Sequence, residues 1–385
     1  MIRMLQRTSI SMSKTKRMEN NTMSESMGKN NKVVLGLSGG VDSTAAALLL
    51  QEKGYEVTGL FFDVLGNQER EKERAERAAE ELGIPFVYKN VKDVFSEKII
   101  AYFCESYQKG ETPNPCIVCN PSIKFKVMQE EANRLGAYHL ATGHYANTGY
   151  DADQDSYFIR RADNEQKDQT YMLYRLPQAI IRRLIFPLGS MESKTLTRDL
   201  VRKRSIHNAD LKDSQEICFI KEGSYIDYLK SKGISGYSGE FVDKNGNPLG
   251  KHSGLVHYTI GQRKGLGITF GKPVFVLGMD AQKNQVILGD NEDLFQTIIY
   301  ARDCRFSNQN MEEIGLPKEY EGSEILAKIR YAAKPAKAKV YGQESGVIRV
   351  EFEEKQRAAT PGQSLVLYQE DRLIGGGFIF DGESK

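Results

Sequence analysis

Two stretches of the sequence place cysteines where they could act as nucleophiles. Cys116 and Cys119 lie in the polar, proline-rich run Thr112–Asn120, and Cys218 follows the acids and amides of Asp213–Ile217. A thiolate with a lowered pKa is a strong nucleophile in water. Five cysteines in a chain with no secretory signal indicate a reducing compartment, so disulfides are not expected. The alternative is a set of buried structural thiols.

A third stretch could bind phosphate. The apolar run Lys32–Leu37 indicates a strand buried on both faces, and Ser38–Ser43 follows it as Ser-Gly-Gly-Val-Asp-Ser. Glycines let backbone N–H groups approach an anion, and a helix predicted from Thr44 to about Lys53 would point its positive end there. The run is neither a Walker loop nor a dinucleotide fingerprint. A simple Gly-Gly turn is the alternative, and we favour a phosphate cradle.

Alternating strands and helices are predicted around this loop. The strands are expected at 55–62, 85–91 and 137–141, and the helices at 67–83, 93–107 and 122–136. This alternation predicts a doubly wound α/β domain with a parallel sheet, which binds its ligand at the carboxyl ends of the strands. Between Gln108 and Pro121 a long loop is predicted, and such loops are usually functional.

The second half of the chain changes character twice. After Leu176 it is helical and basic, with these residues: Arg182, Arg183, Lys194, Arg198, Arg202 and Arg204. From about Ile234 glycines and short strands predominate, with a hairpin signal at Asn245-Gly246. The β-rich runs 328–331, 347–352 and 364–368 predict a small barrel-like domain. The predicted organisation is a disordered leader (1–30), a nucleotide-binding catalytic domain (31–233), a central β-rich domain (234–298) and a C-terminal barrel (299–385).

Composition limits the partners. The 385 residues are 40% hydrophobic and 27% charged, which is globular, and no apolar run is long enough for a membrane span. The net charge of the chain is +2, but residues 1–30 carry +4 and the remaining residues carry −2, so an RNA partner would need local basic patches. The stretches 244–279 and 325–343 contain no acid and interleave basic with aromatic residues, which suits RNA. Solvated strand faces are the alternative.

Taken together, these motifs closely resemble the tRNA-specific 2-thiouridylases of the MnmA/TrmU family, in which Ser38–Ser43 is the PP-loop of an ATP pyrophosphatase with an adenine nucleotide α hydrolase-like fold. The resemblance extends from Val33 to about Ile379. It also includes the following runs: Ala141–Tyr145, Lys167–Tyr171, Tyr258–Gly267, Lys328–Tyr331 and Pro361–Gln363.

The resemblance implies an enzyme that adenylates the 2-oxygen of the wobble uridine in tRNA and then replaces AMP by sulfur. It implies ATP binding by these residues: Gly36, Leu37, Ser38, Gly39, Gly40, Val41, Asp42, Ser43, Phe62 and Gly143. Cys119 would be the catalytic nucleophile and Cys218 the persulfide carrier. The expected tRNA contacts are Asn114, Pro115 and Cys116 at the target base, Lys167, Asp168 and Gln169 at the anticodon region, and Arg330 and Tyr331 in the last domain. Mg²⁺ is expected with ATP, and Asp42 is its expected anchor.

One residue departs from the family pattern, because many relatives carry Asp where this chain has Cys116. Cys116, Cys119 and Cys218 could therefore hold a [4Fe–4S] cluster with one iron open to sulfide. Alternatively Cys116 is a bystander or resolving thiol and a persulfide delivers the sulfur. Cys104 and Cys304 match no motif and are expected to be packing residues, and His144 is expected to be structural.

The predicted partners are tRNA and an upstream sulfur donor, either a cysteine desulfurase or a sulfur-relay protein. The predicted location is the cytoplasm, with organelle targeting by the basic leader as a minor alternative. Two other functions stay open. One is a PP-loop ligase or amidotransferase that acts on a small carboxylate and needs neither thiol. The other is a non-catalytic RNA-binding protein with a relict nucleotide site.

Overall fold

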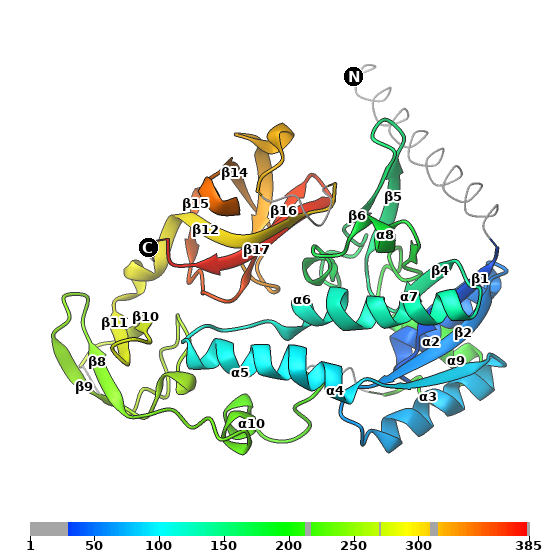
Figure 1. Ribbon diagram of the computed structural model, residues 1–385, viewed down its shortest axis with the longest axis horizontal. Helices are drawn as coiled ribbons and strands as arrows, with labels where there is room; N and C mark the ends of the chain where they lie inside the picture. The colour runs from blue at the N-terminus through cyan, green and yellow to red at the C-terminus, as the bar shows by residue number, and fades with distance from the viewer. Residues whose placement is uncertain (1–29, 212–216, 269–270, 309–314, 383–385) are drawn as a thin grey trace. The chain divides into compact units, whose positions relative to one another are not determined.

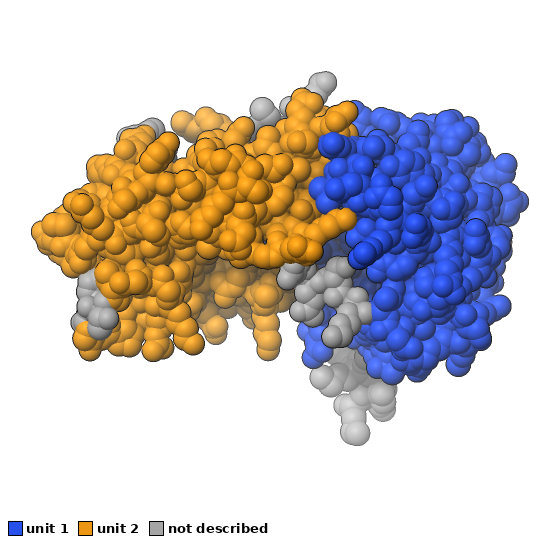
Figure 2. All heavy atoms as spheres, turned by 90° about the horizontal axis from the view of Figure 1, so that it is seen from below, with its two compact units in different colours: residues 1–92, 120–213, 371–373 blue, residues 93–119, 214–370, 374–385 orange. Residues whose placement is uncertain are grey.

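The computed structural model describes residues 30–211, 217–268, 271–308 and 315–382. The chain divides into two compact units, which Figure 2 colours separately. Unit 1 comprises Met1–Lys92, Asn120–Asp213 and Asp371–Leu373, and unit 2 comprises Asp93–Cys119, Ser214–Glu370 and Ile374–Lys385. Within the described ranges, no helix has the length and apolar character needed to cross a membrane. The predicted leader lies outside the described residues except for Asn30, and the other predicted domain boundaries stay predictions.

Unit 1 is built on a five-stranded parallel sheet of order β3-β2-β1-β4-β7. Figure 1 labels its strands β1, β2 and β4. The strands are β1 Lys32–Gly36, β2 Glu56–Asp63, β3 Phe86–Asn90, β4 His139–Thr142 and β7 Leu184–Ile185. Val33, Val34 and Leu35 of β1 are at most 1% exposed, as expected for the central strand of a covered parallel sheet. The predicted doubly wound fold is confirmed.

Helices cover this sheet and place its loops. Those that pack on its strands are α2 Val41–Glu52, α3 Glu69–Leu82 and α7 Phe125–Arg134, whereas α8 Gln178–Ile181 packs on β6 and α9 Lys194–Lys203 on α2. Helix α7 packs on β1 and β4, whereas α2 packs on the sheet and against α9. Helix α3 buries Ala75, Ala78, Ala79 and Leu82 and ends, as predicted, at Gly83, whose φ of +65° is the left-handed conformation of a helix C-cap.

The hairpin of β5 (Asn147–Asp151) and β6 (Ser156–Arg160) in unit 1 was not predicted. Every residue of β5 is only half-buried, so the strand has no alternating apolar pattern. Arg372 and Leu373 pair with β6, and the guanidinium of Arg372 lies 2.8 Å from the carboxylate of Asp151.

The predicted long loop from Gln108 to Pro121 is wrong in its second half. Residues 92–108 are helical as expected, in α4 Lys92–Phe95, a π turn Ser96–Ile100 and α5 Ala101–Gln108. Helix α6 then spans Pro115–Cys119, and a second π turn, Asn120–Lys124, contains Pro121. Asn114 accepts a hydrogen bond from the Cys116 N–H (3.2 Å), which caps the start of α6. Proline is favoured at the first position of a helix, but with three prolines in the run we interpreted Pro115 as part of a loop.

Unit 2 contains a four-stranded sheet of order β10-β11-β8-β9. Its strands are β8 Gly239–Val242, β9 Pro248–His252, β10 Phe275–Asp280 and β11 Gln285–Gly289, and helix α10 (Tyr225–Ser231) precedes them. The predicted hairpin at Asn245-Gly246 joins β8 to β9, and Gly246 supplies the positive φ of +84°. The sheet buries Phe241, Tyr258 and Val276 in its core.

Unit 2 also contains a closed six-stranded barrel, which confirms the predicted barrel. Its strands are β12 Phe295–Phe306, β13 Glu324–Lys328, β14 Ala336–Gly342, β15 Ile348–Arg357, β16 Ser364–Gln369 and β17 Arg372–Phe380, and pairing of β12 with β17 closes it. The predicted strand 328–331 is wrong after Lys328. Arg330 instead begins a turn, in which the Ala333 N–H donates to the Arg330 carbonyl at 3.1 Å. Pro335 follows this turn and has no N–H to donate, so the strand does not resume before it.

Candidate active site

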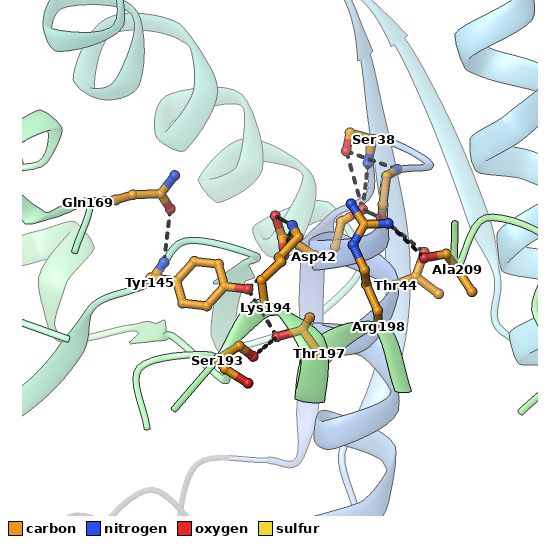
Figure 3. A network of polar contacts seen from close by, with 12 residues as sticks. Ser38, Asp42, Thr44, Tyr145, Gln169, Ser193, Lys194, Thr197, Arg198 and Ala209 are labelled. Atoms are coloured by element: carbon orange, nitrogen blue, oxygen red, sulfur yellow. Dashed lines mark hydrogen bonds and ion pairs between the residues drawn. The ribbon is translucent and has the colours of Figure 1, made fainter. Parts of the chain in front are cut away.

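The loop between β1 and α2 is closed by its own hydrogen bonds (Figure 3). The Ser38 N–H donates to Ser43 Oγ at 3.2 Å, and the Ser43 hydroxyl donates to the Gly40 carbonyl at 2.9 Å. The Gly40 N–H donates to Ser38 Oγ at 3.3 Å, and the Thr44 hydroxyl also donates to the Gly40 carbonyl. The loop is therefore preorganised at the positive end of α2, where an anion is favoured.

Two positions at this loop require glycine. Gly39 has a φ of +73°, and a Cβ there would lie 2.8 Å from the backbone nitrogen of Ala75. A Cβ on Gly143, which directly follows β4, would lie 2.8 Å from the carbonyl carbon of Asp42. Phe62 comes within 3.6 Å of the place of a Cβ on Gly36. The structure thus gathers the predicted ATP-binding residues at one edge of the sheet, while their ATP contacts stay a prediction.

Asp42, the expected magnesium anchor, is engaged by a cation (Figure 3). Lys194 Nζ lies 2.7 Å and 2.6 Å from its two carboxylate oxygens, and the Tyr145 hydroxyl donates to it at 2.9 Å. Thr197 Oγ1 lies 3.0 Å from the same tyrosine oxygen. The Asp42 side chain is still 34% exposed, so it can reach a ligand at the loop.

The segment after α9 also contacts the loop between β1 and α2. Asn208 is fully buried, and its amide donates to the Gly39 carbonyl (3.0 Å) and to Thr44 Oγ1 (2.7 Å). Arg198 donates to the Ala209 carbonyl at 2.9 Å, which holds this segment to α9. Sequence reasoning missed Lys194, Tyr145 and Asn208 as parts of the cradle. The sequence did contain a signal for Lys194, because this lysine begins helix α9 and no acid follows it in the first turn. A cation at a helix N-terminus is unfavourable next to the helix dipole, so it indicates an acidic partner elsewhere in the fold.

His144 is a structural residue, in line with the expectation. Its Nδ1 lies 2.7 Å from Thr142 Oγ1, and its ring packs against Phe125 and Phe186. Burial, with a smaller contribution from the charge of Lys124, lowers the pKa of His144 to about 3. The ring is therefore neutral at physiological pH.

The first two thiols lie on α6 in unit 2. The capping bond of Asn114 fixes the start of this helix, Cys116 is exposed and Cys119 at its last position is half-buried. None of the five cysteines, all of which are described, is in a disulfide. Cys104 and Cys304 are buried, as expected for packing residues.

Cys218 is exposed on a segment that an aromatic cluster anchors. Phe219, which is 3% exposed, packs edge-on against Phe95 and Phe103 and also contacts Tyr228. Burial raises the pKa of Tyr228 to about 12, with smaller contributions from the nearby thiols of Cys104 and Cys218. The polar run 213–216 lies outside the described residues.

Across the described residues, no group of three His, Cys, Asp or Glu side chains is arranged to hold a metal ion. A [4Fe–4S] cluster at Cys116, Cys119 and Cys218 therefore stays a prediction.

The predicted anticodon contacts differ in accessibility. Asp168 is 4% exposed and accepts hydrogen bonds from the Ala162 N–H (3.1 Å) and the Thr170 hydroxyl (2.8 Å). Gln169 Oε1 accepts from the Tyr145 N–H at 3.0 Å, so this residue supports the segment beside the cradle. Lys167 is half-buried. RNA contact by these three residues stays a prediction, and Asp168 is already committed to its own turn.

Arg330 and Tyr331 are exposed in the turn after β13. Arg330 donates to the Arg357 carbonyl at 3.0 Å, and Tyr331 packs against the ammonium of Lys328, which is itself buried. In the other basic stretch, acids from outside neutralise two lysines: Lys244 pairs with Asp293 (2.6 Å), and Lys272 pairs with Asp290 (2.7 Å). Counting acids along the sequence missed these pairs.

Comparison with known proteins identifies the class first. Three family models match successive parts of the chain: "tRNA methyl transferase HUP domain" at residues 31–222, "tRNA methyl transferase PRC-barrel domain" at 226–290 and "Aminomethyltransferase beta-barrel domain" at 297–379. The chain is thus a nucleotide-binding HUP domain followed by two β-domains.

Curated relatives identify the family. The chain is 44% identical over 361 residues to "tRNA-specific 2-thiouridylase MnmA 1" of Clostridium botulinum (strain Loch Maree / Type A3), which covers 90% of this chain and 99% of the relative. It is 42% identical to "tRNA-specific 2-thiouridylase MnmA" of Clostridioides difficile (strain 630), with 92% and 99% coverage, and 42% identical to the enzyme of that name from Acetivibrio thermocellus, with 90% and 99% coverage. The chain belongs to the MnmA family of tRNA-specific 2-thiouridylases.

Proposed function

We propose that this chain catalyses the ATP-dependent 2-thiolation of the wobble uridine in tRNA anticodons. The observation that carries the proposal is the presence, in one chain, of a preformed phosphate cradle and two accessible thiols, Cys119 and Cys218. The names of the curated relatives support the same activity.

The first step uses the cradle. Uridine O2 attacks the α-phosphorus of ATP, an O–P bond forms and pyrophosphate leaves, so that AMP replaces oxygen as the leaving group on C2. The backbone N–H groups at the start of α2 and the ammonium of Lys194 compensate the phosphate charge. The half-exposed carboxylate of Asp42 fits Mg²⁺, and this ion would supply further charge neutralisation.

The second step uses the thiols. The terminal sulfur of a Cys218 persulfide attacks C2, and AMP leaves with O2. The Cys119 thiolate then attacks the Cys218 sulfur, which breaks the persulfide S–S bond, releases 2-thiouridine and forms a Cys119–Cys218 disulfide. A dithiol reductant restores both thiols, and an upstream sulfur donor, a cysteine desulfurase or a sulfur-relay protein, reloads Cys218. We place this reaction in the cytoplasm, and no step is assigned to a cluster.

The other functions use only parts of this arrangement. A ligase for small carboxylates would need the cradle but neither thiol, and an RNA-binding protein would need neither. The methyl transfer in the names of two family models would require no ATP cleavage.

The test measures AMP, pyrophosphate and 2-thiouridine with purified protein, ATP, Mg²⁺, tRNA and a persulfide donor. Thiolated tRNA is detected by its slower migration in a gel that contains an organomercury ligand. We expect AMP release that depends on tRNA and is lost when cytidine replaces the wobble uridine. AMP release with a small carboxylate and no tRNA would indicate the ligase, and binding of tRNA without AMP release would indicate the RNA-binding protein.

A further inference from the structure

The barrel holds the backbone that precedes the thiol helix α6. The Thr112 N–H donates to the Pro361 carbonyl at 2.8 Å, and Gln363 Nε2 donates to the Thr112 carbonyl at 2.8 Å. Both backbone polar groups of Thr112 are therefore bonded to one turn, Pro361–Gln363. Thr112 and this turn belong to the same compact unit, unit 2.

The turn itself is fixed to the barrel. The Gly362 N–H donates to the Ile379 carbonyl at 3.1 Å, and the Ile379 N–H donates to the Gln363 carbonyl at 2.8 Å. The Gln363 N–H closes the turn on the Thr360 carbonyl at 3.1 Å. Strand β17, which contains Ile379, thus determines where the turn lies.

Gly362 lets the two segments approach. Its φ is +86°, and a Cβ there would lie 2.9 Å from Glu111 Cβ and 3.0 Å from the Thr112 nitrogen. Backbone atoms cannot move aside as the end of a flexible side chain can, so any larger residue must push the segments apart. An ion pair between Arg302 of β12 and Glu111, at 2.8 Å, adds a second attachment.

The attachment lies close to the thiols along the chain. Two residues after Thr112, Asn114 accepts the N–H of Cys116 through its side chain and the N–H of Ile117 through its carbonyl, both at 3.2 Å. These bonds fix the first turn of α6, which ends at Cys119. Helix α6 has five residues and continues directly into the π turn Asn120–Lys124, so the place where its start is held constrains Cys119 from the N-terminal side.

We propose that the Pro361–Gln363 turn is a positioning element for sulfur transfer, and that the barrel therefore serves the chemical step as well as RNA contact. The turn touches no reacting atom and acts through the backbone that carries Cys119. This inference rests on the proposed function, since it assumes that Cys119 takes part in sulfur transfer.

The test compares two glycines of nearly equal φ. Gly362→Ala introduces both strain and collision, whereas Gly246→Ala, at φ +84° with no described atom within 4 Å of the added Cβ, introduces strain alone. For Gly362→Ala we expect faster hydrogen exchange in the peptide that contains Thr112, and thiolation lowered at least tenfold. We also expect tRNA-dependent AMP formation and tRNA affinity within twofold of the wild type. Gly246→Ala should match the wild type in all four measurements.

A second variant covers the case in which Gly362→Ala does not fold. Gln363→Met keeps the side-chain length and removes the bond to the Thr112 carbonyl, and it should show the same separation of thiolation from AMP formation. The proposal is overturned if exchange at Thr112 rises while thiolation is unchanged, or if AMP formation falls together with thiolation. Failure of the proposed function is distinguishable, because the wild type itself would then form no 2-thiouridine whereas the exchange result would still stand.

Discussion

The phosphate cradle and the thiol region hold their functional side chains in opposite ways. Asp42 is bound by Lys194 and by Tyr145, and the serines of the loop bond to one another. Cys116 and Cys218 are exposed and Cys119 is half-buried. The difference matches the two chemistries. Phosphate charge is best stabilised by groups that do not have to reorganise, whereas sulfur must be received from one molecule and delivered to another.

The thiols are nevertheless positioned, through their neighbours rather than through themselves. Phe219 anchors the segment of Cys218 in an aromatic cluster, and Asn114 with Thr112 anchors the segment of Cys119. A reactive side chain can thus stay accessible while the backbone next to it is fixed. This contrast predicts that the two regions can be disabled separately.

The largest expected effect separates the two regions completely. Cys119→Ser and Cys218→Ser should abolish thiolation and leave tRNA-dependent AMP formation intact, because the predicted ATP-binding residues include neither thiol. Cys116→Ser is the matched control, since it lies on the same helix and should retain thiolation by the persulfide route. The gel assay for 2-thiouridine and the AMP assay measure the two steps. If Cys116→Ser is inactive, thiolation requires all three thiols, and this result would support the cluster hypothesis.

The next effect lies within the cradle. Asp42→Asn and Lys194→Met should each lower AMP formation by about 10²-fold, because the first removes the proposed Mg²⁺ anchor and the second removes the ammonium proposed to compensate the phosphate charge. If Lys194 only pairs with Asp42, the double variant will match Asp42→Asn alone. We expect a further loss, because the ammonium also compensates phosphate charge. Arg202→Met on the same helix, which removes exposed pairs with Asp199 and Asp210, is the control and should be unaffected.

The sequence was sufficient for the parts of the site that are local in the chain. Ser38–Ser43 follow a buried strand and lead into helix α2, so hydrophobic pattern and glycine content predicted this strand, turn and helix, although the helix begins at Val41 rather than at the predicted Thr44. Phosphate binding by the loop stays a prediction. The parallel sheet and the barrel followed from the same kind of pattern, whereas β5 was missed because its residues are uniformly half-buried.

Contacts between distant segments could not be predicted in the same way. Lys194 reaches Asp42 across 152 positions, and Gln363 reaches Thr112 across 251. Neither pair has a local pattern, because the partners meet only once the strands are packed. The same reason explains why the ion pairs of Lys244 and Lys272 were missed. No acid lies in their own stretch of sequence, and their acidic partners lie further along the chain.

A smaller effect is expected for RNA binding by the barrel, which should be independent of the cradle. Arg330→Ala and Lys337→Ala remove exposed cations, and each should reduce the salt dependence of tRNA affinity by about 0.7–0.9 in the log–log slope. Asp42→Asn should leave this slope unchanged. Lys272→Ala is the control, because Asp290 already neutralises that lysine. Affinity measured by filter binding at several salt concentrations gives the slopes, and equal slopes for all variants would remove the barrel from the RNA-binding surface.

The smallest expected effect concerns the pH range over which the cradle edge stays folded. His144 follows Gly143, and burial holds its pKa at about 3, below the value of about 6.5 in an unfolded chain. Between these values the unfolded state binds a proton that the folded state does not, so stability falls as pH falls from 6.5 toward 3. From pH 6.5 to 5 the loss attributable to this ring is roughly 2 kcal/mol.

His144→Gln removes this titration while keeping a side chain that can bond to Thr142, so its unfolding free energy should change less between pH 7.5 and 5.0 than that of the wild type. Denaturant unfolding at the two pH values measures the difference. His252, whose pKa burial also lowers, still titrates in this variant, so some acid sensitivity should persist. Equal acid sensitivity of the two proteins would show that His144 becomes protonated in the folded state. The edge of the sheet that carries Gly143 would then be less rigid than the hydrogen bonds of the cradle indicate.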